Sequence, residues 1–271
     1  MTSITSTATV PQHHRPHDGR VALVTGAARG LGEAIARQLH ADGAAVVLAD
    51  ILADEVEAVA SDLDVPDRRA VAHPIDLTVE AEVDGLIEAV FERFGRLDIL
   101  VQCAAVQVEK RLHETTTEEW DRLHATNLRA LFCGARAVLP RMMERGGGVI
   151  LNVGSTLGLR VDPILAAYGV MKHGVVGLTR AIAADPTYAR AGIRALTLCP
   201  GDVMTDMQRA FWAALPDPEG ARAHVEAQYP NGRIALPAEV ARLASLLVSD
   251  DAGIVSGAEI VADNGRFPLY Y

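Results

Sequence analysis

The chain has 271 residues, of which 49% are hydrophobic, and its formal net charge at pH 7 is −10. This length and apolar content are sufficient for one large α/β domain, or two small ones, with a real hydrophobic core. Because the charge balance is acidic and no basic stripe runs along the chain, we expect no binding to the phosphate backbone of a nucleic acid.

The cysteines and the hydropathy pattern restrict the class of protein further. Cys103, Cys133 and Cys199 are odd in number and share no close spacing, which argues against a disulfide framework and a zinc knuckle. No apolar run reaches the roughly 18 residues that a membrane helix needs, and the N-terminus lacks the pattern of a signal peptide. We therefore expect a soluble, cytoplasmic protein with no membrane partner and no metal ion.

The first 19 residues are rich in Ser, Thr, His and Pro and show no apolar periodicity, which is typical of a flexible tail. His13, His14 and His17 could alternatively form a metal site. No cysteine lies near them in the sequence, so a solvated tail is the preferred interpretation.

From Arg20 onward, short apolar runs alternate with longer amphipathic segments. The runs are mostly apolar throughout, as expected for strands that are buried on both faces of a sheet. Repeated strand–helix units predict an α/β fold, a doubly wound Rossmann-type parallel sheet of about seven strands with helices on both faces. The predicted strands are 21–25, 45–49, 70–73, 99–102, 149–153, 194–198 and 259–261, and the predicted helices are 31–42, 53–63, 79–94, 118–144, 164–184 and 237–247.

No internal repeat or interdomain linker interrupts this pattern, so we predict a single domain over residues 20–271. An irregular insertion near residues 202–233 breaks the alternation. Its Pro216, Asp217, Pro218 and Gly220 are typical of a loop that orders as a lid when a ligand binds.

A glycine-rich turn, Thr25-Gly-Ala-Ala-Arg-Gly-Leu-Gly32, joins the first strand to the first helix. Gly26 permits the tight turn, and Gly30 and Gly32 let backbone come close to a diphosphate at the helix N-terminus, where free N–H groups favour an anion. The spacing is not that of the general dinucleotide fingerprint, and an ordinary strand–helix turn is the alternative. Its place in the first strand–helix–strand unit favours a nucleotide site formed with Arg29 and Leu31.

Asp50 ends the second predicted strand, eighteen residues after Gly32. That offset suits a carboxylate that binds the adenosine ribose hydroxyls and repels a 2′-phosphate, which favours NAD over NADP. Arg29 could instead meet such a phosphate, and Asp50 could instead cap the following helix. Asp76, followed by Leu77 after the third strand, could touch the adenine or serve as another helix cap.

Tyr168 and Lys172 are four residues apart in a predicted helix and therefore share a face. A tyrosine hydroxyl titrates near pH 10, and a neighbouring ammonium stabilises the phenolate and makes the phenol a better acid and base. Ser155 follows the predicted strand 149–153 at the edge where open α/β sheets bind ligands, and its hydroxyl could donate to a substrate oxygen. Asn127 lies inside a predicted helix, which indicates a special role or a local kink. An exposed helical pair and ordinary loop hydrogen bonds are the alternatives.

Taken together and in order, these motifs resemble the short-chain dehydrogenase/reductase family in its single-domain form, from about Gly19 to Gly265. The loop Pro200-Gly201 with Val203 and Thr205 resembles the family's nicotinamide loop. The resemblance implies that Tyr168 is the general acid/base, that Ser155 orients the substrate oxygen, and that Lys172 grips the ribose and lowers the tyrosine pKa. It also implies that Asn127 holds a water in a proton relay.

One departure from the family pattern lies after the fourth predicted strand. The family usually has Asn-Asn-Ala-Gly, where this chain has Gln102-Cys-Ala-Ala105. Ala105 adds a methyl group where the backbone runs close to the cofactor, so the ribose contacts expected of Cys103, Ala104 and Ala105 differ in detail from those of the family.

These inferences predict an NAD-dependent oxidoreductase that moves a hydride between NAD(H) and the carbon of a secondary alcohol or ketone. A non-catalytic NAD-sensing regulator or scaffold on the same fold is the alternative. The substrate pocket is expected to be largely apolar, although each lining residue could equally belong to the core, and the identity of the alcohol stays open. The family resemblance implies a homo-oligomer, a tetramer or dimer. The expected substrate contacts are Ser155, Leu157, Val161, Tyr168, Met204 and Trp212.

Overall fold

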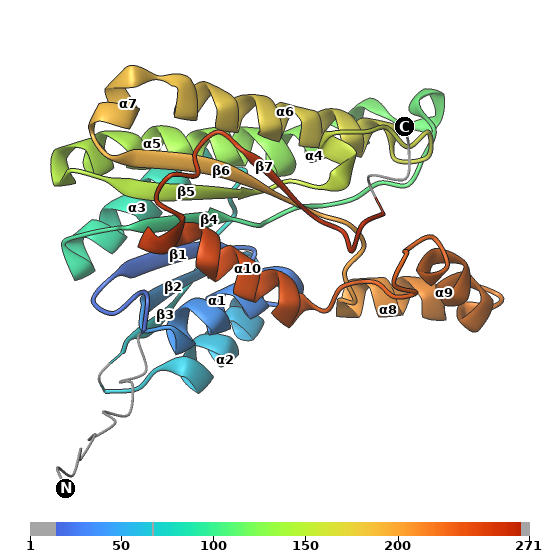
Figure 1. Cartoon of the computed structure of the whole chain (residues 1–271), viewed down its shortest axis with the longest axis horizontal. Coiled ribbons are helices and arrows are strands. Elements are labelled where there is room, and N and C mark those ends of the chain that lie inside the picture. The colour runs from blue at the N-terminus through green and yellow to red at the C-terminus, as the bar shows by residue number, and fades with distance from the viewer. Residues whose placement is uncertain (1–14, 67, 267–271) are drawn as a thin grey trace, which may run out of the picture.

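Seven parallel strands form one sheet in the order β3-β2-β1-β4-β5-β6-β7 (Figure 1). The structure is a computed structural model, and it describes residues 15–66 and 68–266. Each predicted strand is present, with ends that differ from the prediction by at most two residues. The strand order reverses between β1 and β4, which is the arrangement of a doubly wound fold. The strands are β1 Val21–Thr25, β2 Ala45–Asp50, β3 Ala70–Pro74, β4 Ile99–Gln102, β5 Gly148–Val153, β6 Ile193–Pro200 and β7 Glu259–Ala262.

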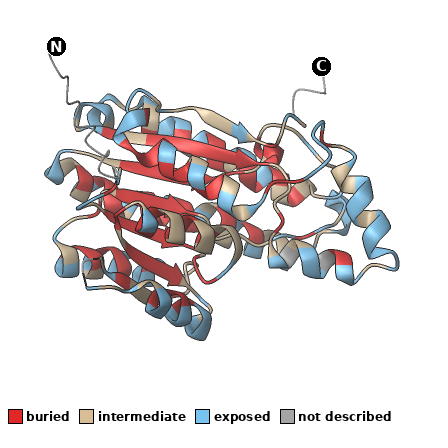
Figure 2. Ribbon diagram, turned by 60° about the horizontal axis from the view of Figure 1, so that its bottom comes forward, coloured by how far each residue is buried: buried red, intermediate tan, exposed pale blue. Residues whose placement is uncertain are grey.

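Helices cover both faces of the sheet because successive strand residues point to opposite sides (Figures 1 and 2). Ala22 and Val24 of β1 pack beneath α1, α2 and α10, whereas Val21 and Leu23 pack with α3 and α5 on the other face. The two apolar layers confirm the predicted α/β class. The helices covering the sheet are α1 Gly30–Ala41, α2 Ala53–Leu63, α3 Glu80–Phe94, α4 Thr117–His124, α5 Ala130–Arg145, α6 Ala166–Ala184, α7 Pro186–Arg190 and α10 Pro237–Val248.

A π-helical turn, Ala125–Arg129, joins α4 to α5. The predicted helix 118–144 is therefore interrupted at the position of Asn127, as its unfavourable place in a helix interior suggested. The N–H of Ala130 donates to the carbonyl of Ala125, five residues back, and so the turn contains one residue more than an α-helical turn.

The insertion between β6 and α10 is helical, so the prediction of an irregular segment is wrong. It forms α8 Asp206–Ala213 and α9 Pro218–Glu226, which project beyond the carboxyl ends of the strands (Figure 1). Asp217 caps α9 by accepting a hydrogen bond from the N–H of Gly220, and Pro218 occupies the first turn, where a missing N–H costs nothing. The residues interpreted as loop signals are thus the start of a helix.

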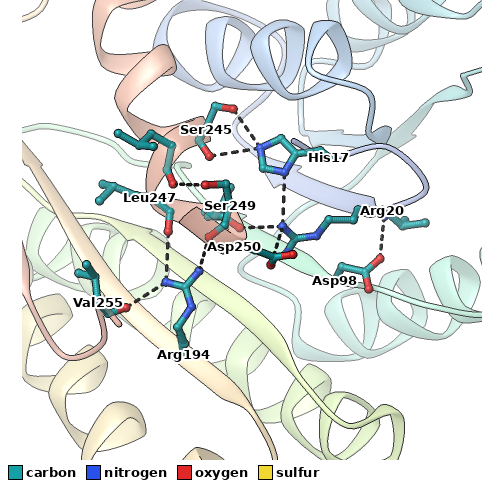
Figure 3. A network of polar contacts seen from close by, with 12 residues as sticks. His17, Arg20, Asp98, Arg194, Ser245, Leu247, Ser249, Asp250 and Val255 are labelled. Atoms are coloured by element: carbon teal, nitrogen blue, oxygen red, sulfur yellow. Dashed lines mark hydrogen bonds and ion pairs between the residues drawn. The ribbon is translucent and has the colours of Figure 1, made fainter. Parts of the chain in front are cut away.

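The segment just before β1 is packed, so the prediction of a flexible tail is wrong for residues 15–19; residues 1–14 lie outside the described residues. His17 is fully buried, and its Nε2 lies 3.0 Å from Ser245 Oγ on α10. Ser245 in turn donates to Asp42 at the end of α1, at 2.5 Å. This chain of contacts ties the N-terminal segment to both helices, and Figure 3 shows its first link, between His17 and Ser245.

Two arginines complete this polar network at the amino ends of the strands (Figure 3). Arg20 donates to the carbonyl of Val248 at 2.9 Å, and Arg194 donates to the carbonyls of Val255 and Ser249, each at 2.9 Å. The carbonyls of Val248 and Ser249 lie at the C-terminal end of α10, where a helix leaves them without partners, and Val255 follows in the loop before β7. Hydrogen bonds within the chain thus satisfy these polar groups at the amino ends of the strands.

Among the described residues, the structure has no helix that is both long and apolar enough to cross a membrane.

Candidate active site

The carboxyl ends of the strands bring the predicted motifs to one edge of the sheet. The register pairs Thr25 with Gln102, Gln102 with Asn152, and Val153 with Leu198. The loops that follow β1, β4, β5 and β6 therefore start side by side. Ligands of open α/β sheets bind at this edge, at the point where the strand order reverses.

The glycine-rich turn approaches its neighbours too closely to accept side chains. A Cβ on Gly32 would lie 2.0 Å from the carbonyl oxygen of Gly26, and one on Gly26 would lie 2.7 Å from Ala104 Cα. Gly26 and Gly30 also have positive φ angles, 69° and 65°. The turn therefore requires glycine for steric reasons, and it leaves the backbone at the start of α1 bare for an anion.

Asp50 connects the end of β2 to the glycine-rich turn. Its Oδ2 accepts from the N–H of Ala28 at 3.0 Å, and its Oδ1 accepts from the N–H of Leu52 at 3.1 Å. The second bond is local, but Leu52 rather than Asp50 is the N-cap of α2, so the helix-cap alternative does not describe it. The carboxylate is half-buried beside the turn.

The other predicted adenine and phosphate contacts lie around this turn. Arg29 is exposed at the N-cap of α1, and Leu31 packs against the apolar layer beneath that helix. Asp76 accepts from the N–H and the hydroxyl of Thr78, at 2.9 and 2.7 Å, and thus shapes the turn after β3. Leu77 packs against the layer beneath α3.

The loop after β4 is held by a residue that the sequence analysis did not single out. Thr25 Oγ1 accepts from the N–H of Cys103 at 3.1 Å and from that of Ala104 at 3.5 Å. A threonine at the end of a buried strand, directly before a glycine turn, was the available signal. Cys103, Ala104 and Ala105 are half-buried, and burial raises the pKa of the Cys103 thiol to about 12. This thiol is therefore protonated and unreactive at neutral pH.

Tyr168, Lys172 and Ser155 are brought together by α6 and the loop after β5. Lys172 is buried; its Nζ donates to the carbonyl of Val153 at 2.8 Å and lies 5.5 Å from the centre of the Tyr168 ring. The Ser155 hydroxyl accepts from the N–H of Leu157 at 3.1 Å and lies close enough to the Tyr168 phenol for hydrogen bonding to lower the pKa of that phenol. The predicted helical pair is thus not an exposed one.

Burial sets the protonation of this cluster. Burial raises the pKa of Tyr168, and the hydrogen bond with Ser155 opposes that rise. Burial also lowers the pKa of Lys172 to about 8. The expectation that Lys172 lowers the tyrosine pKa is therefore not met in this structure, because burial and the charge of Asp202 both raise the pKa of the phenol and only the hydrogen bond with Ser155 lowers it.

Asn127 fastens the loop after β4 to the π-helical turn. Its Oδ1 accepts from the N–H of Val106 and its Nδ2 donates to the carbonyl of Val106, both at 2.8 Å, and the side chain is fully buried. The amide thus holds backbone, and the role of binding a water in a proton relay stays a prediction.

The loop after β6 turns back toward the glycine-rich turn. Pro200 ends β6, and a Cβ on Gly201 would lie 2.8 Å from the hydroxyl of Tyr229. Val203 pairs with Ala235 in an isolated bridge, and the Thr205 methyl group lies 3.5 Å from the position of a Cβ on Gly30. The structure therefore brings the predicted nicotinamide loop beside the predicted phosphate loop.

The predicted substrate contacts divide into two groups. Leu157 is buried next to Ser155, whereas Val161 is 83% exposed. Met204 and Trp212 are buried in an apolar cluster with Tyr229 and Ile234, so they form the core of the inserted helices.

Within residues 15–66 and 68–266, no group of three or more His, Cys, Asp or Glu side chains is arranged to hold a metal ion.

The comparisons with known proteins agree with this geometry. Residues 26–266 match a family model described as enoyl-(acyl carrier protein) reductase. The chain is 34% identical to the D-beta-hydroxybutyrate dehydrogenase of Rhizobium meliloti, over 91% of this chain and 98% of that protein. It is 36% identical to the D-threitol dehydrogenase of Mycolicibacterium smegmatis, over 92% and 93%.

A solved structure shows the same fold. The crystal structure of levodione reductase superposes with a TM-score of 0.88 at 32% identity, over 93% of this chain and 99% of that one. The chain is therefore an oxidoreductase that belongs to the short-chain dehydrogenase/reductase family.

Proposed function

We propose that the protein is an NAD-dependent secondary-alcohol dehydrogenase and ketoreductase in which Tyr168 is the general acid/base. The observation that carries the proposal is the convergence of the Tyr168 phenol, the Ser155 hydroxyl and the buried Lys172 ammonium at the sheet edge. Relatives named D-threitol dehydrogenase and levodione reductase support an alcohol or ketone as the substrate.

The cofactor proposal rests on two features of the glycine-rich turn. The turn excludes side chains at Gly26 and Gly32 and thereby offers bare backbone to a diphosphate. Asp50 places a carboxylate beside that backbone, where it suits two ribose hydroxyls and repels a third phosphate group. We therefore propose NAD as the cofactor, held by the turn, by Asp50 and by the loops after β4 and β6.

The side chains perform the proton chemistry. The bound dinucleotide would supply the hydride for reduction and accept it for oxidation. Tyr168 donates its proton to the substrate oxygen as negative charge develops there, and takes the proton back in the oxidative direction. Ser155 donates a hydrogen bond to the same oxygen, which stabilises that charge in the transition state. Lys172, held by the carbonyl of Val153, supplies a fixed positive charge and a donor toward the ribose.

We also propose that the protein works in the cytoplasm as a homo-oligomer. β7 is an edge strand of the sheet, and apolar side chains near it and on α10 are exposed: Val261, Ile254 and Leu246. Exposed apolar groups at an unpaired edge favour contact with another copy of the chain. The mass of the purified protein in solution tests this part of the proposal.

The function is tested with a panel of secondary alcohols and ketones, each assayed with NAD(H) and NADP(H) by the absorbance of reduced nicotinamide. We expect turnover with NAD, and we expect Asp50→Ala to narrow the preference for NAD over NADP by about tenfold, the effect of about 1.4 kcal/mol. A wild-type enzyme that prefers NADPH would contradict the role of Asp50. Tight NAD binding without turnover of any substrate in the panel would instead favour a sensor.

A further inference from the structure

Asp202 lies at the same sheet edge as Ser155 and Tyr168 but takes no part in the chemistry proposed above. It follows the end of β6 by two residues, and β6 pairs with β5, the strand that precedes Ser155. The N–H of Gly154 donates to the carbonyl of Leu198 at 2.7 Å, so the two loops start next to each other where they leave the sheet. The Asp202 carboxylate is close enough for its charge to raise the pKa of Tyr168.

The carboxylate is fixed by residues from two other segments. Tyr229, which follows α9, donates to Asp202 Oδ2 at 2.7 Å, and its oxygen accepts from the N–H of Asp202, also at 2.7 Å. Arg266, which follows β7, forms an ion pair with the same Oδ2 and lies over the Tyr229 ring, 5.1 Å from its centre. A side chain held by residues from two other segments is preorganised, because little rotational freedom remains to be lost on binding.

The other carboxylate oxygen, Oδ1, takes no part in these contacts. The side-chain contacts of Asp202 with the described residues all involve Oδ2, and Oδ1 accepts no hydrogen bond from any of them. The side chain is 33% exposed, so a ligand can reach it. An ionised carboxylate has about four acceptor positions, and leaving half of them unused beside an acid/base group is consistent with a binding role.

Charge decides which group Oδ1 would accept. The guanidinium of Arg266 compensates the charge of Asp202 at Oδ2, so the pair offers little net attraction to an ammonium group. A substrate carboxylate is ionised and has no proton to donate to Oδ1. A neutral hydroxyl donates a hydrogen bond without a change in charge, and it is the donor that this site fits.

We propose that Asp202 is a specificity-determining residue whose Oδ1 accepts a hydrogen bond from a second hydroxyl of the substrate, so that the enzyme prefers diols and polyols to simple secondary alcohols. This inference rests on the proposed function. Tyr229 and Arg266 act as positioning residues that aim the carboxylate.

The test compares cyclohexane-1,2-diol with cyclohexanol, which share a ring and a secondary alcohol and differ in the second hydroxyl. A hydrogen bond to a charged group is worth about 1.5–3 kcal/mol, so Asp202→Ala is expected to lower the ratio of the two kcat/KM values by about 10- to 100-fold. Asp202→Asn keeps the side-chain size and removes the charge, and its ratio should fall by a smaller factor.

Asp217→Ala is the matched control. It removes a carboxylate from the same insertion, where the side chain only caps α9. We expect it to leave the diol-to-alcohol ratio within about twofold of wild type, since a looser helix affects both substrates alike. An equal loss for both substrates in Asp202→Ala and Asp202→Asn would overturn the specificity role. A wild-type enzyme that oxidises cyclohexanol without favouring the diol would overturn this inference alone, whereas one that oxidises neither alcohol nor any substrate of the wider panel would contradict the proposed function.

Discussion

The edge of the sheet at the amino ends of the strands and the edge at their carboxyl ends both bury polar and charged side chains, but they use these side chains differently. At the amino ends of the strands, Arg20, Arg194 and His17 direct their hydrogen bonds to backbone carbonyls and to Ser245 (Figure 3). At the carboxyl ends, the Ser155 hydroxyl lies near the Tyr168 phenol, and Asp202 Oδ1 accepts no hydrogen bond from a described residue. The first edge closes the fold, whereas the second keeps hydrogen-bonding capacity for a ligand.

The comparison shows that a buried titratable residue is not evidence of a site by itself. His17, Ser245 and Asp42 have the residue types of a catalytic triad, yet the serine donates to the aspartate and the histidine is fully buried. A nucleophile needs an oriented base and access to a substrate, and this arrangement provides neither. The loops at the carboxyl edge leave Ser155 and Tyr168 half-buried, and that access separates the two edges.

The strongest contrast between the edges is expected from Tyr168→Phe. The variant removes only the hydroxyl, so turnover should fall by about 10²- to 10⁴-fold, the usual contribution of a general acid/base, while NADH binding stays the same. Steady-state kinetics and a fluorescence titration with NADH measure the two effects. Retention of most of the activity would show that another group moves the proton.

Gly32→Ala is expected to have a smaller effect than Tyr168→Phe, but one that reduces both dinucleotide binding and stability. The new Cβ would lie 2.0 Å from the carbonyl oxygen of Gly26, so the glycine-rich turn must move, and we expect weaker dinucleotide binding together with a lower thermal midpoint. Gly85→Ala in α3 is the control, because a Cβ there meets nothing within 4 Å. The control should stabilise the protein by about 1 kcal/mol through helix propensity. Normal NAD affinity in Gly32→Ala would mean that the turn is not the diphosphate site.

Substitutions at the amino ends of the strands should change the stability of the fold and leave catalysis unchanged. Burial lowers the pKa of His17, so the folded state holds this ring neutral while the unfolded chain binds a proton near pH 6.5. The contribution of His17 is therefore complete above pH 6.5 and is lost as the pH falls toward its folded-state pKa. His17→Ala should cost about 1–3 kcal/mol in urea unfolding near neutral pH and leave kcat unchanged.

His17→Gln separates the two parts of this prediction. Glutamine can still bond to Ser245 but does not titrate, so the loss of stability between pH 6.5 and 5 should be shallower than in the wild type. An identical pH dependence in both proteins would assign the acid sensitivity to other groups.

The sequence predicted the fold well because its signals are local. Each strand is a short apolar run, and each covering helix has a buried stripe, so the order of elements follows from periodicity alone. The site motifs were predictable for a related reason: Gly26, Asp50 and Ser155 lie at or just after the ends of strands whose register then brings them together.

Other features depend on contacts between distant segments and leave little trace in the sequence. The packing of His17 depends on Ser245, which is 228 residues away. The position of Asp202 depends on Tyr229 and Arg266, and the raised pKa of Tyr168 depends on how closely the protein surrounds the phenol. A residue-by-residue pattern contains neither the partners nor the burial that produce these effects.

The π-helical turn at Ala125–Arg129 changes the phase of the long helix that contains it. An α-helix has about 3.6 residues per turn, so one additional residue rotates the positions that follow by about 100°. Leu123 before the turn and Leu131 after it can therefore both face inward, while Asn127 between them reaches Val106. Deletion of a single residue in this turn would restore a regular helix and rotate every side chain of α5 relative to α4. The packing of α4 and α5 therefore depends on the number of residues in this turn as well as on their identity.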